Sequence, residues 1–314
     1  MVKDEIVSSS IGLTDVEGIL VGHATDAEHC TGCTAVLCAE GFTPGVCIPG
    51  FAPGTRDLEL MRSENAVGEV HGIYLGGGSA FGLAGSEGIV RFLVEQEAGL
   101  VMPDARIPLV PGAIIYDLDV NKAPGRLPSP SMGYQAAKSA SAAPVTVGRL
   151  GAGTGARCGR LFSLLPGWNA MSPGGLGSAG ARIGDVVVAA LAVVNCLGRV
   201  HDPDSGAWLA GGVDSQGRPL PEQVAVQLMS GIIPSGNTTL VVVATNAVLD
   251  KVSSNRVARM AAAGMARAIR PTHLTMDGDV VFTLSRKTGP AANENLIGAL
   301  AADAVGRAIA SAVR

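Results

Sequence analysis

The 314-residue chain has little charge and few aromatic side chains. Charged residues make up 16% of it, against about 25% in an average globular protein. Phe, Tyr and Trp together make up 4%, whereas 47% of the residues are apolar. Disorder needs low hydrophobicity and high charge, so this composition excludes it and predicts a large core of Ala, Val, Leu and Ile. The net charge is −4 and no basic block is present, which argues against a nucleic-acid partner.

The sequence also lacks a long apolar segment. The purest apolar run is Val186–Val194, far shorter than the roughly 20 residues that cross a bilayer. The first residues contain acidic side chains and no continuous apolar stretch, unlike a secretory signal. Six irregularly spaced cysteines favour reduced thiols over a disulfide framework. These features predict a cytoplasmic protein with no membrane partner.

Glycine-rich turns separate short apolar runs over the N-terminal two-thirds of the chain. One helix is expected after Gly76–Gly78, running toward Glu97 with Ser79 as its N-cap. Residues 201–237 are polar and rich in turn formers, which predicts a long exposed connection. No internal repeat is apparent, and we expect a single domain over residues 1–314.

The C-terminal part of the chain has a β-α-β-β-α pattern. Thr239–Thr245 is a continuous apolar run, which indicates a strand covered on both faces. A helical apolar stripe follows from Val257 to Ile269, and Pro271 ends it. This alternation predicts a layered α/β architecture.

A hairpin and a final helix complete this pattern. His273–Met276 and Val280–Ser285 are predicted to pair around Asp277-Gly278-Asp279. The final helix is expected to begin near Asn293.

Two glycine-rich stretches have the spacing of a dinucleotide fingerprint. Gly151–Ala156 has the G-x-G-x-x-A form, and Gly175–Gly180 has the G-x-G-x-x-G form. The fingerprint needs a strand before it, a helix after it and an acid about 20 residues further on. Asp185 is too far from the first stretch, and the second precedes a strand. Tight turns and close backbone packing are therefore a better interpretation than a nucleotide site.

A metal site and a serine-hydrolase triad have weak support. His29-Cys30-x-x-Cys33 has C-x-x-C spacing, but a structural zinc site usually brings a second pair of ligands, and none follows. Gly78–Gly82 has the wrong spacing for a G-x-S-x-G elbow. A Ser-His-Asp triad stays open, because its members need only meet in space. We expect neither a metal nor another cofactor.

The sharpest candidate lies between the polar connection and the buried strand, in Ser235-Gly236-Asn237-Thr238-Thr239. If the chain were cut here, a hydroxyl residue would become a new N-terminus and carry its own base. An α-amine has a pKa of about 7.7–8.0, so part of it is neutral near pH 7 and can accept the proton of the adjacent hydroxyl. Alternatively, Thr238 and Thr239 only begin a β-strand, which β-branched residues favour.

With these residues the sequence resembles the DmpA-type aminopeptidases, which include L-aminopeptidase/D-esterases, β-peptidyl aminopeptidases and endo-type nylon-oligomer hydrolases. An ordered set of short stretches carries the resemblance and is more specific than any one motif. The stretches are Gly12–Val16 with Val21-Gly22-His23, Gly77–Leu83, Val110-Pro111-Gly112, Gly151–Gly155, Gly174–Ala179, Asn237-Thr238-Thr239 and Asp277-Gly278-Asp279.

The resemblance implies an αββα sandwich of the N-terminal-nucleophile-hydrolase type, made as an inactive precursor that cuts itself once. The cut would fall between Asn237 and Thr238, giving an α chain of residues 1–237 and a β chain of residues 238–314. Thr238 would be the nucleophile, and Asn195 would donate a hydrogen bond to the oxyanion.

The resemblance also implies that Asp277 and Asp279 orient the hydroxyl and the amine of Thr238, and that Tyr116 lines the substrate cleft. Without the resemblance, the two carboxylates would be an exposed hairpin tip, and Asn195 would be a hydrogen-bonding residue at a strand end.

One position departs from the family pattern. Many relatives have Lys where this chain has Pro173, directly before a Gly-Gly pair. The nearest cations upstream are Arg157 and Arg160. An Arg is always charged and cannot accept a proton, but it can bind a carboxylate, which makes Arg160 a candidate substrate-binding residue.

Together these features predict a self-processing amide hydrolase or aminopeptidase that attacks small peptides or amide oligomers through Thr238. Nylon-type 6-aminohexanoate oligomers are among the candidate substrates, and the family implies a homo-oligomer. One alternative is a catalytically silent binding or biosynthetic protein of the same fold, which Pro173 leaves open. Another is a nucleotide-dependent oxidoreductase, which the missing acid opposes.

Overall fold

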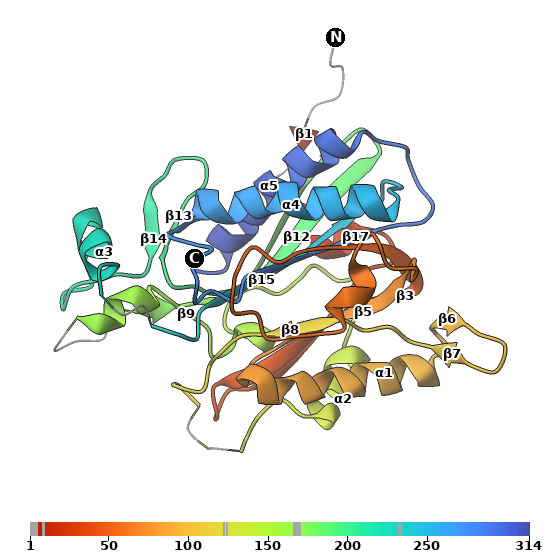
Figure 1. Ribbon diagram of the computed structural model, residues 1–314, viewed down its shortest axis with the longest axis horizontal. Helices are drawn as coiled ribbons and strands as arrows, with labels where there is room; N and C mark the ends of the chain where they lie inside the picture. The colour runs from red at the N-terminus through yellow and green to blue at the C-terminus, as the bar shows by residue number, and fades with distance from the viewer. Residues whose placement is uncertain (1–5, 8–9, 122, 124, 166–170, 232–233) are drawn as a thin grey trace, which may run out of the picture.

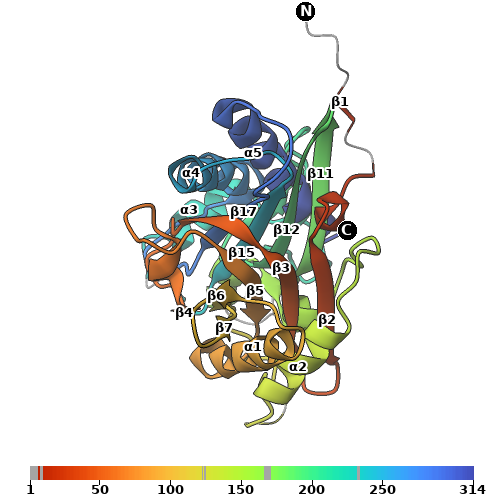
Figure 2. The ribbon, with the colours of Figure 1, turned by 90° about the vertical axis from the view of Figure 1, so that its right-hand side faces the viewer.

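Four layers, in the order helices, sheet, sheet and helices, make up the fold (Figure 1). The structure is a computed structural model that describes residues 6–7, 10–121, 123, 125–165, 171–231 and 234–314. One outer layer consists of α4 (Lys251–Ala268) and α5 (Glu294–Ser311), and the other of α1 (Ser86–Glu95) and α2 (Pro130–Lys138). Figure 2 shows these two helix pairs on opposite sides of the strands.

The two sheets share one long strand, β3 (Thr31–Cys47), whose register shifts between Leu37 and Phe42. The first sheet has the order β1 (Ile6–Val7), β11 (Gly175–Ile183), β12 (Val186–Asn195), β15 (Thr238–Thr245), β17 (Val280–Ser285) and β3. The second contains β2 (Leu20–Asp26), β3, β5 (Val70–Gly76), β8 (Gly112–Ile114) and β4 (Thr55–Arg56).

Shorter elements lie outside the two sheets. β6 (Leu100–Val101) pairs with β7 (Arg106–Ile107), β9 (Arg157–Cys158) with β10 (Ser172–Pro173), and β13 (Arg199–His201) with both β14 (Trp208–Ala210) and β16 (Ile269–Arg270). The short helix α3 (Glu222–Leu228) stands at the left edge of Figure 1, beside β13 and β14.

Alternating side chains explain why β12 is apolar along its whole length. Successive side chains of a strand point to opposite faces of the sheet. Val188 and Ala190 belong to the core packed against α4 and α5, whereas Leu191 and Val193 belong to the core between the two sheets. Both faces are therefore covered, and every residue of β12 is buried. The same holds for β15, which confirms the prediction for this strand.

The predicted hairpin around Asp277-Gly278-Asp279 is wrong. Val280–Ser285 does form a strand, β17, but it runs parallel to β15 and antiparallel to β3. Residues 273–276 are not a strand. The Leu274 N–H donates to Asp277 Oδ2 at 2.7 Å, and the Asp277 N–H donates to the Leu274 carbonyl at 2.9 Å. These bonds close a local turn in place of the strand pairing.

The predicted N-cap at Ser79 is also wrong. The helical segment begins with a 3-10 stretch, Ser79–Gly85, whose N-cap is Gly78 in the left-handed region at φ 79°. Ser79 itself has φ 54°, and its N–H donates to the Ile115 carbonyl at 3.0 Å. The segment 201–237, predicted as an exposed connection, contains β14 and α3.

Two further observations bear on the sequence predictions. All six cysteines are free thiols, as expected. No helix in the described ranges is both long enough and apolar enough to span a membrane.

Candidate active site

The candidate site forms where β12 ends and β15 begins. Asn195, the last residue of β12, lies opposite Thr238, the first residue of β15. Asn237 forms a parallel bridge with Asp277, because β17 runs alongside β15. All four residues are buried, with at most 5% of their surface exposed. Strand pairing therefore brings together three segments that are far apart in the sequence.

Two donors point at the carbonyl group of Asn237. The Thr238 hydroxyl donates to this oxygen at 2.5 Å, and the Gly278 N–H donates to it at 2.8 Å. A Cβ atom on residue 278 would lie 2.6 Å from Thr238 Oγ1, so glycine is required for this close approach. The sequence offered the Asp-Gly-Asp turn as a signal, but its interpretation as a hairpin tip missed this role of Gly278.

Asp279 holds the beginning of β15 in place. Its Oδ1 accepts the Thr239 N–H at 2.7 Å, and its Oδ2 accepts the Thr272 hydroxyl at 3.0 Å and His273 Nδ1 at 2.8 Å. Burial lowers the pKa of His273, but the hydrogen bond and charge of Asp279 outweigh it and raise this pKa. Thr272 and His273 were not expected from the sequence, since nothing in their local pattern marks them.

Asp277 has an environment suited to proton exchange. Burial and the charge of Asp279 raise the pKa of Asp277 to about 7. The value lies close to that of a free α-amine, which is about 7.7–8.0. In the described part of the chain, neither carboxylate is hydrogen bonded to the Thr238 hydroxyl, which donates to the Asn237 carbonyl together with the Gly278 N–H.

The side chain of Asn195 is fixed by three backbone groups. Its Oδ1 accepts the Arg157 N–H at 3.0 Å. Its Nδ2 donates to the carbonyls of Tyr116 and Gly236, both at 3.1 Å. The amide therefore lies next to the Asn237–Thr238 bond, with one donor bonded to Gly236, in the segment that precedes this bond, and the other to Tyr116.

Beside Thr238 is a cavity of about 230 Å³. Tyr116 lines it, and so does the stretch Ser79-Ala80 from the glycine-rich segment that carries part of the family resemblance. The other lining residues are Ala52, Pro53, Gly54, Ile114, Ser235, Gly236, Asn237, Thr238 and Met276. The residues before the Asn237–Thr238 bond thus form one wall of the cavity.

Arg160 lies behind this cavity and does not line it. Its guanidinium forms an ion pair with Asp119 at 2.8 Å and lies 5.6 Å from the centre of the Tyr116 ring. Arg160 is 6% exposed. The Arg160 guanidinium therefore packs against the Tyr116 ring and helps to hold it in place.

Arg157 and Pro173 lie opposite each other in the β9–β10 pair. The position where many relatives have Lys is therefore next to an arginine, and the N–H of this arginine holds Asn195. Arg157 is thus the cation that the β9–β10 pair places beside Pro173.

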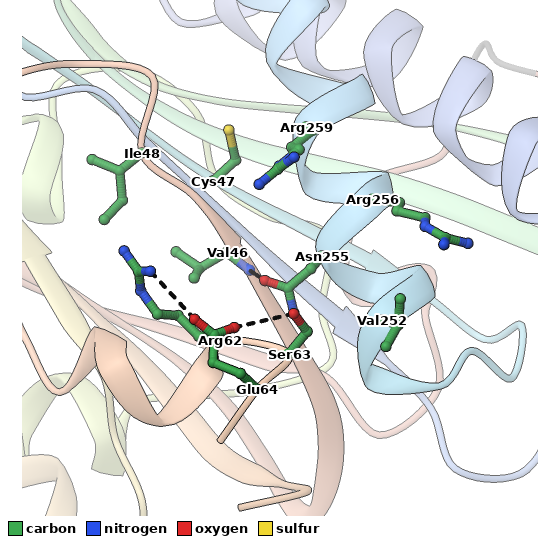
Figure 3. Close-up of a pocket in the computed structure, with 10 residues that line it drawn as sticks. All are labelled: Val46, Cys47, Ile48, Arg62, Ser63, Glu64, Val252, Asn255, Arg256 and Arg259. Carbon is green, nitrogen blue, oxygen red and sulfur yellow. Dashed lines mark hydrogen bonds and ion pairs between the residues drawn. The ribbon is translucent and has the colours of Figure 1, made fainter. Parts of the chain in front are cut away.

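A separate cavity of about 460 Å³ lies between β3, the 3-10 turn at Leu58–Met61 and α4 (Figure 3). It shares no lining residue with the cavity at Thr238. Three arginines line it, and two of them have carboxylate partners: Arg62 pairs with Glu64 at 3.4 Å, and Arg256 with Glu294 at 3.0 Å.

Comparison with known proteins identifies the family. The model of peptidase family S58 matches residues 12–314. An uncharacterised aminopeptidase of Mycobacterium leprae is 38% identical over 294 residues, which cover 87% of this chain and 78% of that protein. A 6-aminohexanoate-oligomer endohydrolase of Kocuria sp. is 29% identical over 86% of this chain and 74% of its own length.

Solved structures show the same fold. A β-aminopeptidase of Burkholderia sp. has a TM-score of 0.66 at 23% identity, covering 96% of this chain and 85% of that one. The L-aminopeptidase D-Ala-esterase/amidase of Ochrobactrum anthropi, described as a variant of the Ntn hydrolase fold, has a TM-score of 0.69 at 18% identity and the same coverage. The predicted αββα fold and the resemblance to DmpA-type aminopeptidases are confirmed. The chain is an amide- or peptide-bond hydrolase that belongs to peptidase family S58.

Proposed function

We propose that the chain cuts itself between Asn237 and Thr238 and then hydrolyses small peptides or amide oligomers with Thr238 as its N-terminal nucleophile. The observation that carries the proposal is the pair of donors on the Asn237 carbonyl, the Thr238 hydroxyl at 2.5 Å and the Gly278 N–H at 2.8 Å. The products would be one folded unit of two chains, residues 1–237 and 238–314.

The cleavage step follows from this geometry. Thr238 Oγ attacks the carbonyl carbon of Asn237 and gives up its proton, and the carbonyl oxygen becomes an oxyanion. The Gly278 N–H donates a hydrogen bond to the oxyanion. In other enzymes, the loss of one such donor raises the activation barrier by about 2.7–4 kcal/mol. The C–N bond then breaks, the nitrogen takes up a proton and an ester links Asn237 to Thr238. Water hydrolyses the ester, which frees the Asn237 carboxylate and the Thr238 hydroxyl, beside the Thr238 amine that the C–N cleavage has already released.

Asp277 is the proposed proton carrier of the cleavage step. Its raised pKa, about 7, lets it both accept and return a proton at neutral pH. After cleavage the Thr238 amine takes over as the base, because it is covalently next to the hydroxyl that it serves. Asp277 and Asp279 would then stabilise the ammonium form.

Cleavage would also free the oxyanion donor of the mature enzyme. One Asn195 donor is bonded to the Gly236 carbonyl, which lies two residues before Thr238. When the new C-terminus leaves, this N–H becomes available to the carbonyl oxygen of a substrate. The departing residues Ser235, Gly236 and Asn237 also line the cavity at Thr238, so their release enlarges it.

The volume of the cavity supports a small substrate, since it is about 230 Å³ before the residues that precede Thr238 leave. Tyr116 lines it, held from behind by Arg160, and we assign both to the substrate side of the site. The name of the Kocuria relative supports linear amide oligomers such as those of 6-aminohexanoate. We further propose a cytoplasmic homo-oligomer. Two large exposed apolar side chains support the oligomer: Phe51 and Phe81 are 72% and 69% exposed, and each directly adjoins a residue that lines the cavity.

Paired threonine variants test the proposal. Thr238→Ala should leave one uncut chain with no hydrolysis of aminoacyl amides, β-peptides or short polyamides, because one oxygen serves both reactions. Thr239→Ala is the matched control, since the Thr239 hydroxyl is buried and has no hydrogen-bond partner in the described part of the chain. Normal cleavage in Thr238→Ala would refute Thr238 as the nucleophile.

A further inference from the structure

A third cavity lies beneath α3 and has a different chemistry. Its volume is about 250 Å³, and it shares no lining residue with the cavity at Thr238. Its lining combines apolar residues (Ala225, Val226, Met229 and Pro271) with charged and polar ones (Arg199, His201, Glu222 and Arg270). The cavity therefore offers both apolar surface and charged or polar groups.

Arg199 is a buried cation that forms no direct ion pair among the described residues, although the charge of Glu222 acts on it. The residue is 4% exposed. Its Nη2 donates to the Pro221 carbonyl at 3.1 Å, and its guanidinium lies 4.6 Å from the centre of the Phe162 ring. In the described ranges it forms no ion pair, and its Nε has no hydrogen-bond partner. Burying a charge without a counter-ion is costly, so this guanidinium would be stabilised by an anion.

The neighbouring groups leave the cavity with positive charge. Arg270 lines the same cavity and has no ion pair in the described part of the chain. His201 is 4% exposed and its Nδ1 has no partner among the described residues. Burial and the nearby Arg270 lower the pKa of His201, so the ring is neutral at pH 7. Glu222 offsets only one of the two guanidinium charges.

The contrast with the cavity of Figure 3 is informative. There, Arg62 and Arg256 have carboxylate partners and are about half exposed, with 49% and 61% of their side chains accessible. Under α3, neither arginine forms an ion pair among the described residues, and Arg199 is the buried one of the two. Solvent and direct ion pairs compensate the first pair of charges, whereas buried Arg199 forms no direct ion pair among the described residues and feels only the charge of Glu222.

We propose that the cavity under α3 binds a small amphiphilic monocarboxylate. The carboxylate would lie between Arg199 and Arg270, since guanidinium groups match carboxylate geometry. The aliphatic part would contact Ala225, Val226 and Met229. The cavity volume of about 250 Å³ lies below the roughly 300–1,000 Å³ of pockets that take drug-sized ligands, which favours a small ligand such as hexanoate.

Such a ligand would join α3 to the loop that carries part of the active site. Arg270 and Pro271 directly precede Thr272 and His273, which hold Asp279. α3 lies in the segment that leads to the proposed cleavage site. The inference does not depend on hydrolysis, since binding can be measured in a chain that cannot react.

The test is calorimetric titration of the Thr238→Ala chain with hexanoate, using 1-hexanol and hexylamine as probes of similar length without the negative charge. We expect saturable hexanoate binding in the high-micromolar to millimolar range and no comparable binding of the other two. Equal binding of hexanoate and hexanol would overturn the proposal, because it would show an apolar groove only. Absence of saturable hexanoate binding would overturn it as well.

Two variants locate the binding site. Arg270→Gln should weaken hexanoate binding about tenfold, the effect of losing one charged contact. Glu222→Gln should strengthen it, since it removes the one carboxylate that lines the cavity. Both positions are exposed, so the fold should tolerate these changes, which thermal unfolding verifies. Unchanged affinity in Arg270→Gln would refute the site even if hexanoate binds elsewhere.

Discussion

Replacing Asp277 with Asn should change how the stability of the uncut chain depends on pH. The experiment uses Thr238→Ala as the parent, so that no new amine is present near the carboxylate. Asn has the same shape as Asp, and its amide oxygen can still accept the Leu274 N–H, which donates to Asp277 at 2.7 Å. The substitution therefore tests charge with little change in packing.

The direction follows from the raised pKa. Burial and the charge of Asp279 raise the pKa of Asp277 to about 7 in the folded chain, against about 3.9 in an unfolded chain. Between these values the folded state binds more protons than the unfolded state, so the free energy of unfolding falls as the pH rises. The loss reaches about 4 kcal/mol, since each pH unit corresponds to about 1.4 kcal/mol.

The assay is urea unfolding at a series of pH values from about 4 to about 8. Relative to its parent, Asp277→Asn should gain stability steadily as the pH rises, with the gain levelling off above about pH 7. Burial lowers the pKa of His273, and the hydrogen bond and charge of Asp279, which both proteins keep, raise it; the charge of Asp277 adds a smaller part, which the substitution removes. If both proteins lose stability in parallel, Asp277 is ionised like an exposed carboxyl, and it cannot carry a proton at neutral pH.

Two substitutions examine the groups around the scissile bond. Gly278→Ala should slow self-cleavage strongly, because the new Cβ would lie 2.6 Å from Thr238 Oγ1; intact mass over time measures the rate. Gly68→Ala is its control, since nothing lies within 4 Å of a Cβ there, and equal cleavage rates in the two variants would contradict the assigned role. Asn195→Ala should cost roughly 3 kcal/mol in urea unfolding, because three backbone partners lose their bonds, and hydrolysis should fall about 100-fold or more. Hydrolysis near the wild-type rate would exclude Asn195 as the oxyanion donor.

Local sequence signals predicted the elements that build the fold. The continuous apolar run at β15 indicated a strand covered on both faces, and Asn293 does cap α5, where its side chain accepts the Asn295 N–H at 2.8 Å. These signals depend on neighbouring residues only. The layered class followed from the alternation of such runs with helical stripes.

The detailed site depends on contacts between distant segments, which local patterns do not encode. Gly278 was missed because an Asp-Gly turn usually lies at an exposed hairpin tip, whereas strand β17 here runs beside β15 and buries the turn. Thr272 and His273 were missed because only the folded chain shows them bonded to Asp279. Asn195 and Thr238 could be named together only through the family resemblance, although strand pairing sets them opposite each other.

The most direct test of the central claim is the intact mass of the purified protein, followed by N-terminal sequencing of any small fragment. The account predicts two chains, residues 1–237 and 238–314, with the smaller one beginning Thr-Thr-Leu-Val. A single uncut chain that nevertheless hydrolyses amides at full rate would contradict it, because the Thr238 amine would then not exist to serve as the base.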